Sequence, residues 1–238
     1  MAKKIGKLGH RGRGSSALTR QRVLEEALGL LDREGITSLN MRQLAAHLGV
    51  TPMALYNHVS DKDDLLRGVA ALVVDNVSYG SDSDDWREEI RTCFRALRNA
   101  CLAHPGIVRV VESAKALPSS IFRPMEIALA ALRRAGLEAE DAFRAYCLLM
   151  SFTMGQISYE TRGPYPAADP AEASRQGQLS AATFPASAAA VLAMADRDWD
   201  NDAAFEFGLS TILAGLNNFA RAKATSKRRS RTTRASKD

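Results

Sequence analysis

Hydrophobic residues recur at helical spacing along most of the chain. Between residues 19 and 34 the apolar side chains stand three or four positions apart, which predicts one amphipathic helix that ends at Gly35. No stretch shows the apolar–polar alternation of a half-buried strand. The same periodicity predicts further helices over 41–48, 61–77, 86–103, 121–135, 140–161 and 203–221. The sequence therefore predicts an all-α protein.

Capping and turn signals predict two short helices joined by a tight turn. Asn40 can cap the first helix, and Gly49 can end it in a left-handed conformation. Thr51 can cap the second helix, predicted over 52–59, with Pro52 at its first position, where the missing N–H costs nothing. Because a turn of about three residues that contains glycine forces a steep crossing, this pair predicts a helix-turn-helix.

The rest of the chain is predicted to form a larger helical bundle. Ser60 is expected to cap the helix that leads into it. Pro105-Gly106 is expected to break helix 86–103, and the proline-rich stretch 163–187 to form a long loop. Helix 140–161 is apolar nearly all round, which predicts burial on most sides.

The net charge of +5 conceals an uneven distribution. Residues 1–68 carry 11 Lys/Arg and 7 Asp/Glu, residues 69–222 carry 14 and 19, and residues 223–238 carry 7 and 1. Basic ends on a chain with an acidic middle suggest a polyanionic partner, and nucleic acid comes first. A basic tail alone could equally be a solubilising extension, so the inference needs a folded motif.

Composition argues against several other classes of protein. No apolar run approaches the roughly 18 residues that span a bilayer, and the basic N-terminus lacks the apolar core of a signal peptide, so we expect a cytoplasmic protein with no membrane partner. Cys93, Cys101 and Cys147 lie in apolar segments and are interpreted as small core residues. The four scattered histidines form no catalytic or zinc-binding constellation, so we expect no enzyme, metal or cofactor.

The second helix of the helix-turn-helix carries side chains suited to the major groove of DNA. Pro52 and Met53 can contact thymine methyl groups, and Asn57 can donate and accept hydrogen bonds at the edge of adenine. The phenol of Tyr56 can reach a phosphate or a base. The alternative is that Tyr56 and His58 are half-buried residues with local hydrogen bonds.

Other residues near this helix can bind the DNA backbone. Thr51 and His58 can reach phosphate, and Arg42 can bind either guanine O6 and N7 or a phosphate. Lys62, together with the free N–H groups at the start of the fourth helix, can form an anion site. Residues 1–22 carry seven Lys/Arg and no acid, so they could lie along the duplex. The combination predicts DNA binding.

At these positions the chain resembles the tetracycline-repressor family of transcriptional regulators. The matching marks in residues 27–66 are Gly35, Leu39, Arg42-x-Leu44-Ala45, Leu48-Gly49-Val50, Leu55-Tyr56-x-His58, and Lys62 before Leu65-Leu66. The resemblance implies an all-α homodimer whose N-terminal domains bind a palindromic operator and whose larger domains hold an effector pocket and the dimer interface. It also implies DNA contacts for Arg42, Tyr56 and Lys62. Helices 140–161 and 203–221 would pair with those of the partner in a four-helix bundle.

The stretch SFTMGQISYE (151–160) resembles the segment of the tetracycline repressor around a glutamate that joins in binding a magnesium–drug complex. On that alignment the glutamate falls at Tyr159, with Glu160 one residue away, and the magnesium-ligating histidine falls near Val110, six residues after His104. Mg²⁺ prefers oxygen ligands, and no replacement set is apparent, so we expect an apolar or aromatic organic effector. The pocket candidates, each with core packing as its alternative, are Leu97, Phe143, Tyr146, Met150 and Tyr159.

We therefore interpret the chain as four parts. Residues 1–18 are a basic flexible arm, 19–66 a helix-turn-helix DNA-binding domain, 67–222 a helical effector-binding and dimerisation domain, and 223–238 a basic disordered tail. The function that we predict is a homodimeric repressor that binds palindromic double-stranded DNA and is released by a small molecule. The alternative is a DNA-binding architectural or activator protein without effector control.

Overall fold

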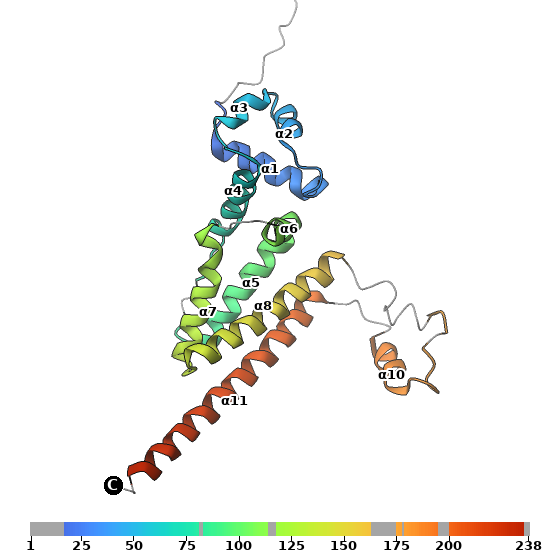
Figure 1. The fold of residues 1–238 in the computed structure, drawn as a ribbon. Helices are drawn as coiled ribbons and strands as arrows, with labels where there is room; N and C mark the ends of the chain where they lie inside the picture. Colours follow the sequence, from blue (N-terminus) through green and yellow to red (C-terminus); the bar gives the residue numbers. More distant parts are fainter. Residues whose placement is uncertain are drawn as a thin grey trace, which may run out of the picture.

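The computed structural model describes residues 17–80, 83–113, 118–162, 175–177, 179–194 and 200–235. The helices in chain order are α1 (Arg20–Glu34), α2 (Met41–Leu48), α3 (Pro52–Tyr56), α4 (Lys62–Asp75), α5 (Trp86–Ala103), α6 (Pro105–Ser113), α7 (Arg123–Arg134), α8 (Ala139–Arg162), α10 (Pro185–Met194) and α11 (Asn201–Ala235), with a 3₁₀ turn, η1 (Ser119–Phe122), before α7. All regular structure in these ranges is helical, which confirms the predicted fold class. Figure 1 shows α2 and α3 at one end of an elongated molecule and the end of α11 at the other. Most of the predicted basic arm lies outside the described residues.

An apolar cluster holds α1, α2, α3 and α4 together. Leu44 of α2 and Leu55 of α3 are fully buried against α1 and α4, where Leu24 and Leu65 face them. Helices α1 and α4 approach closely because Gly68 carries no side chain: a Cβ there would lie 2.6 Å from a methyl group of Leu24. Burying each leucine stabilises the fold by about 1.5–3 kcal/mol, so this cluster fixes α3 on its neighbours.

The turn between α2 and α3 has the predicted caps. Asn40 Oδ1 accepts a hydrogen bond of 2.9 Å from the Gln43 N–H. Gly49 adopts a left-handed φ of 69°, and its N–H bonds to carbonyl groups in the last turn of α2. Thr51 Oγ1 accepts a hydrogen bond of 3.3 Å from the Ala54 N–H. The predicted helix-turn-helix is therefore present.

Helix α3 is shorter than the predicted helix over 52–59. It ends at Tyr56, with Asn57 as its C-cap residue. Just after the helix, the His58 carbonyl accepts a hydrogen bond of 2.6 Å from Arg20 Nη1 on α1. This contact fixes the end of α3 to the first turn of α1.

The start of α4 corrects the expectation that Ser60 caps this helix. Asp61 is the N-cap residue, and its Oδ1 accepts a hydrogen bond of 2.6 Å from the Asp64 N–H. The Asp64 carboxylate accepts from the Ser60 N–H at 3.0 Å and forms a two-pronged ion pair with Arg20, with N–O distances of 2.7 and 2.9 Å. The hydrogen bond from Arg20 lowers the pKa of Asp64 to about 2. Asp64 therefore ties α1, α4 and the end of the helix-turn-helix together.

Helices α5, α7, α8 and α11 form the larger bundle around a second apolar cluster. Phe94 of α5 and Phe205 of α11 are fully buried in it. The ring of Phe152 on α8 stacks on Phe205 with centroids 5.5 Å apart. Figure 1 shows α11 lying along α8. In the described ranges no helix combines the length and the hydrophobicity that a bilayer crossing needs.

An ion-pair cluster around the buried Arg98 side chain joins three of these helices. Arg98 of α5 is 5% exposed, and its guanidinium forms two hydrogen bonds, of 2.7 and 2.9 Å, with the Glu160 carboxylate near the end of α8. It forms a third, of 2.7 Å, with Asp202 in the first turn of α11. The guanidinium also lies over the Phe205 ring, 4.9 Å from its centroid. Arg98 therefore fixes the ends of α8 and α11 to α5.

Helix α5 ends at Ala103, as expected from Pro105-Gly106, but the chain then enters a new helix, α6, that was not predicted. Proline is tolerated in the first turn of a helix, and Pro105 is the first residue of α6. Gly106 lets this turn approach α1, because a Cβ there would lie 3.0 Å from the Leu31 carbonyl oxygen. This close contact places the first turn of α6 directly against α1.

Helix α11 continues to Ala235, so the structure corrects the prediction of a helix that ends at 221 and a disordered tail from 223. Residues 223–235 contain neither glycine nor proline and are rich in Lys, Arg and Ala, which favour helix. Most of the predicted loop 163–187 lies outside the described residues, but its end forms the start of α10.

Helix α8 is not buried on most sides within a single chain. It packs on α5, α7 and α11, which leaves another side open. The exposed side chains include Phe143, Cys147, Leu148 and Tyr159. Cys93 and Cys101 of α5 are buried as predicted, whereas the interpretation of Cys147 as a core residue is wrong. The apolar character of α8 therefore needs an explanation beyond the fold of one chain.

Replacing Glu160 by glutamine should lower the free energy of unfolding by about 3 kcal/mol, because the Arg98 charge would stay buried without its main partner. Urea unfolding at pH 7 measures this change. The matched control is Glu206→Gln on α11, which removes a partly exposed partner of Arg95 and should cost less than about 1 kcal/mol. Equal losses in the two variants would contradict the role of the buried pair.

Replacing Asp64 by asparagine should lower the free energy of unfolding by about 1 kcal/mol at pH 7, a modest value because the Arg20 side chain is 44% exposed. The pKa of Asp64 is lower in the folded protein than the model-compound value of 3.8. Its contribution is therefore complete above about pH 5 and falls as the pH drops toward 2. Unfolding curves between pH 7 and pH 3 should show the gap between the two proteins closing, and a constant gap would exclude this ion pair as its source.

Candidate DNA-reading face and ligand cavity

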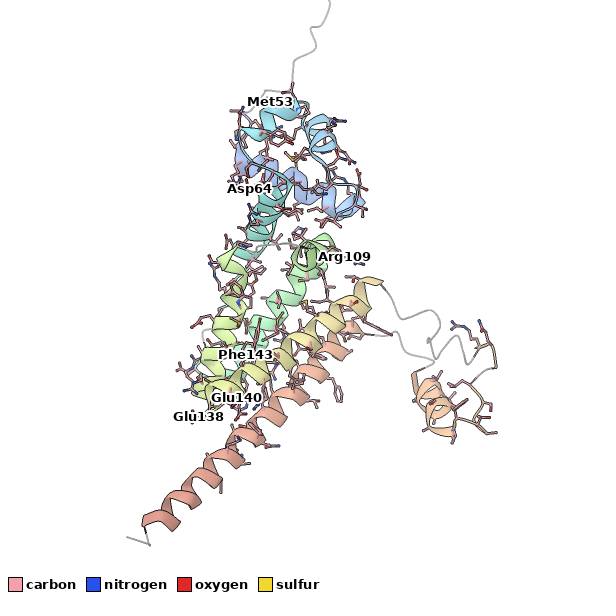
Figure 2. All side chains as sticks on the ribbon, in the orientation of Figure 1. Met53, Asp64, Arg109, Glu138, Glu140 and Phe143 are labelled. Carbon is pink, nitrogen blue, oxygen red and sulfur yellow. The ribbon has the colours of Figure 1, made fainter. Side chains whose placement is uncertain are left out.

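Helix α3 has a buried side and an outward side. Leu55 is buried, whereas Met53 is 74% exposed and Tyr56 is 48% exposed. Pro52 and Asn57 are exposed as well. Figure 2 shows Met53 at the outer end of the N-terminal domain. The four residues predicted to meet bases thus lie together on one exposed face.

Side chains suited to phosphate surround this face. Thr51 is exposed while it caps α3, and Arg42 is exposed in the first turn of α2. Lys62 is exposed as the first residue of α4, where the leading N–H groups of a helix favour anions. His58 is half-buried, and its carbonyl accepts from Arg20. His58 therefore helps to position α3 and borders the face without standing out from it.

A cavity of about 360 Å³ lies in the larger domain, a volume typical of small-molecule sites. Its wall combines side chains from α4, α5, α6, α8 and the start of α7. The wall is mostly apolar and includes Val73, Leu97, Ile107, Pro124, Met150 and Met154. Such a wall accepts apolar groups and makes the burial of an ionised group costly.

The structure brings together part of the predicted pocket set. Three predicted residues line the cavity, namely Leu97, Tyr146 and Met150. Phe143 and Tyr159 do not line it, and both are exposed. Phe143 lies one turn before Tyr146, and the centroids of their rings are 6.3 Å apart. Tyr159 comes directly after Ser158, which lines the wall, and therefore points about 100° away from it around α8. These two residues lie outside this cavity, and a role for them in an effector site stays a prediction. Figure 2 labels Phe143 on α8.

Sequence reasoning missed most of the cavity wall, including the contributions of α6 and of the segment before α5. Tyr79 lies between α4 and α5, in a stretch where polar residues indicate a loop. Ile107 and Arg109 belong to α6, which the sequence did not predict. Apolar residues at helical spacing after Pro105 were the available signal for α6. Figure 2 labels Arg109 on this helix.

Neither the positions that align with magnesium ligands of the tetracycline repressor, Tyr159 and Val110, nor the nearest acid and histidine, Glu160 and His104, form a metal site here. Val110 is buried and apolar, and Glu160 is paired with Arg98. His104 Nδ1 lies 2.8 Å from the Asp32 carboxylate. Among the residues that the structure describes, no group of three or more His, Cys, Asp or Glu side chains is arranged to hold a metal.

Helix α4 connects the reading face with the cavity. Its first residue, Lys62, lies beside α3, and Val73 and Val74 near its other end line the cavity. A second connection is the contact between His104, after α5, and Asp32 of α1. A change of shape at the cavity can therefore reach α3 through a helix that enters both sites.

Comparison with known proteins assigns both halves of the chain. The family model described as bacterial regulatory proteins, tetR family, matches residues 23–69, and the model for the tetracyclin repressor-like C-terminal domain matches residues 80–219. The tetracycline repressor protein class C of Escherichia coli is 34% identical over 210 residues, which cover 84% of this chain and 90% of that repressor. A match to an HTH-type transcriptional regulator of Saccharopolyspora erythraea, 31% identical, covers 60% of this chain and 61% of that protein.

Solved structures agree with this assignment. Apo ActR from Streptomyces coelicolor is 31% identical, with a TM-score of 0.71 over 88% of this chain and all of that chain. ActR in complex with actinorhodin is 32% identical, with a TM-score of 0.67 over 86% of this chain and 99% of that chain. Sequence similarity over both domains and the shared helical architecture lead to one conclusion: the chain belongs to the tetracycline-repressor (TetR) family of DNA-binding transcriptional regulators.

Proposed function

We propose that the protein is a homodimeric transcriptional repressor that acts in the cytoplasm, binds a palindromic operator and leaves it when an apolar organic effector occupies the cavity. The observation that carries this proposal is the pairing of an exposed reading face on α3 with an apolar cavity, connected by α4.

The exposed face of α3 supports sequence-specific binding. A Met53 side chain that is three-quarters exposed gains nothing for the fold of one chain, but it can contact a thymine methyl group in the major groove. Asn57 offers the donor and acceptor that adenine requires. Arg42, Thr51 and Lys62 would hold the phosphates on either side, and such contacts set the register of the helix on DNA.

The open side of α8 and α11 supports a homodimer. On α8, Leu148 and Tyr159 are exposed, and on α11 Phe207 is 76% exposed. Gly155 on α8 and Gly215 on α11 are also exposed, and an added Cβ at either would meet nothing within 4 Å, so another helix could approach closely at these points. An exposed apolar face of this kind is typical of a protein interface. A two-fold dimer through it would present two copies of α3 to the two halves of a palindrome.

The cavity supports control by a small molecule. ActR was solved with actinorhodin, which shows that a similar chain binds an organic ligand. Val73 and Val74 give a ligand direct contact with the end of α4. If the ligand binds more tightly when α4 is tilted, it shifts the population toward dimers whose two α3 helices no longer match the operator spacing.

Replacing Lys62 by alanine should weaken operator binding and lower the slope of log affinity against log salt by about one, because one phosphate contact is lost. The operator is obtained by footprinting the DNA beside the gene, and light scattering of the complex gives the number of chains on it. The control is Lys223→Ala on α11, an exposed lysine far from α3, which should leave both affinity and slope unchanged. Equal effects of the two substitutions would exclude the proposed phosphate site.

A ligand of the cavity should lower operator affinity by roughly 5- to 150-fold, the usual range of allosteric coupling. Replacing Ala100, which lines the cavity, by tryptophan should fill the space and abolish this response while operator binding persists. Fluorescence anisotropy of labelled operator, with and without ligand, measures both effects. A compound that binds the cavity tightly and leaves operator affinity unchanged would contradict effector control.

A further inference from the structure

The cavity has a closed apolar end inside the larger bundle. Tyr79, Ile121 and Tyr146, which line this end, pack in the apolar cluster that surrounds Phe94. Tyr79 is 3% exposed, and its hydroxyl is buried and finds no hydrogen-bond partner among the residues that the structure describes. Because this hydroxyl is not accessible from the cavity, the closed end meets a ligand with apolar surface.

The other end of the cavity opens to solvent beside α6 and the last turns of α8. The exposed residues of the described wall are Pro105, Arg109 and Thr161, and all of them lie at this end. Ile107 of α6 and Ile157 of α8 belong to one apolar cluster, which places these parts of the two helices on the same side of the cavity. Figure 2 shows Arg109 beside the end of α8. A ligand that fills the cavity therefore ends next to Arg109.

Arg109 carries the only charge in the described wall of the cavity at neutral pH. No Asp or Glu is among these lining residues. Burial raises the pKa of Cys101 to about 11 and the pKa of Tyr79 to about 12, so both side chains stay neutral. The cavity thus combines an apolar interior with a single positive charge at its opening.

The guanidinium group of Arg109 can bind a carboxylate at this opening. Its N–H donors form a planar fork that matches the two oxygens of a carboxylate. Arg109 already interacts with another part of the chain, but one guanidinium can serve two carboxylates, as Arg98 does with Glu160 and Asp202. A carboxylate at the opening also keeps part of its hydration, which avoids the cost of burying a charge in the interior.

Two hydroxyl groups add polar character to the open end. Thr161 Oγ1 donates a hydrogen bond of 2.8 Å to the Ile157 carbonyl, so its proton is in use. The Ser158 side chain is half-buried in the wall, and its hydroxyl can rotate to donate to a ligand oxygen. The polar groups of the wall therefore favour an oxygen-rich, anionic group at this end.

The size and charge of the cavity restrict the ligand further. On α8 the lining residues run from Tyr146 to Thr161, a distance of about 22 Å at 1.5 Å per residue. Met150 and Met154 lie between them, and methionine sulfur makes favourable contacts with aromatic rings. A single cation matches one carboxylate better than a phosphate ester, which carries about two negative charges. These features suit a ring system joined by a short chain to a carboxylate.

We propose that the cavity binds an amphipathic carboxylic acid, whose apolar ring system fills the interior and whose ionised carboxylate is held at the opening by Arg109. The inference rests on the proposed role of the cavity as an effector site and specifies its ligand class. Arg109 acts as a specificity-determining residue, because apolar contacts alone cannot distinguish an acid from its neutral amide.

The test compares two probes that share a ring system and a chain, pyrenebutyrate and its neutral amide, pyrenebutyramide. Equilibrium dialysis against the full-length protein measures both dissociation constants. The unaltered protein should bind the acid about tenfold more tightly than the amide, as a charge-assisted hydrogen bond at a partly hydrated site allows. This preference should shrink in about 1 M NaCl, where salt screens exposed charges. Equal affinity for the two probes at low salt would overturn the inference.

Matched variants assign the preference to Arg109. Arg109→Gln should weaken binding of the acid about tenfold and leave binding of the amide unchanged, whereas Arg109→Lys should keep part of the preference. The control Arg144→Gln removes the same charge from an exposed site on α8 outside the cavity and should keep the full preference. If Arg109→Gln weakens both probes equally, Arg109 shapes the cavity and does not read the carboxylate.

The remaining outcomes separate this inference from the proposed function. Ala100→Trp should abolish binding of both probes, and a probe that still binds to this variant lies outside the cavity, which overturns the inference. Failure of both probes to bind the unaltered protein overturns the ligand class. Operator affinity is measured separately. If the acid binds through Arg109 and operator affinity stays unchanged, the inference stands and effector control by this ligand class fails.

Discussion

A guanidinium group that is buried away from water needs negatively charged partners beside it. In the larger domain this constraint comes from Arg98. Glu160 meets it from α8 and Asp202 from α11, so the two helices are fixed to α5 by charge as well as by apolar packing. Because α5 and α8 form much of the cavity wall, the shape of the cavity depends on this cluster.

The N-terminal domain was largely predictable because its signals are local. Asn40, Gly49 and Thr51 each act on backbone groups within a few residues of themselves, so cap and turn chemistry is visible in the sequence. The start of α6 at Pro105 was missed for the opposite reason. The contact of Gly106 with Leu31 joins residues far apart in the chain, and tertiary contacts of this kind override local preference.

The cavity was only partly predictable, because helical periodicity identifies an apolar face without saying what the face contacts. Phe143, Tyr146 and Met150 share one side of α8 by spacing, yet Tyr146 and Met150 line the cavity while Phe143 faces outward. Which apolar residues meet a cavity, a core or another chain depends on how several helices assemble. Tyr79 lies outside any periodic segment, so its burial and its unpaired hydroxyl emerge only from the folded structure.

Helix α3 has five residues, and a helix this short brings about three or four side chains to base edges. Each base pair has four possible identities in the major groove, so a word of four base pairs recurs by chance about once in 250 positions. A genome offers roughly a million or more competing positions, so one sequence of four base pairs cannot specify a single binding site among them. The information needed to find one gene therefore exceeds what one copy of α3 can read, so in the proposed dimer regulatory specificity would be a property of the pair.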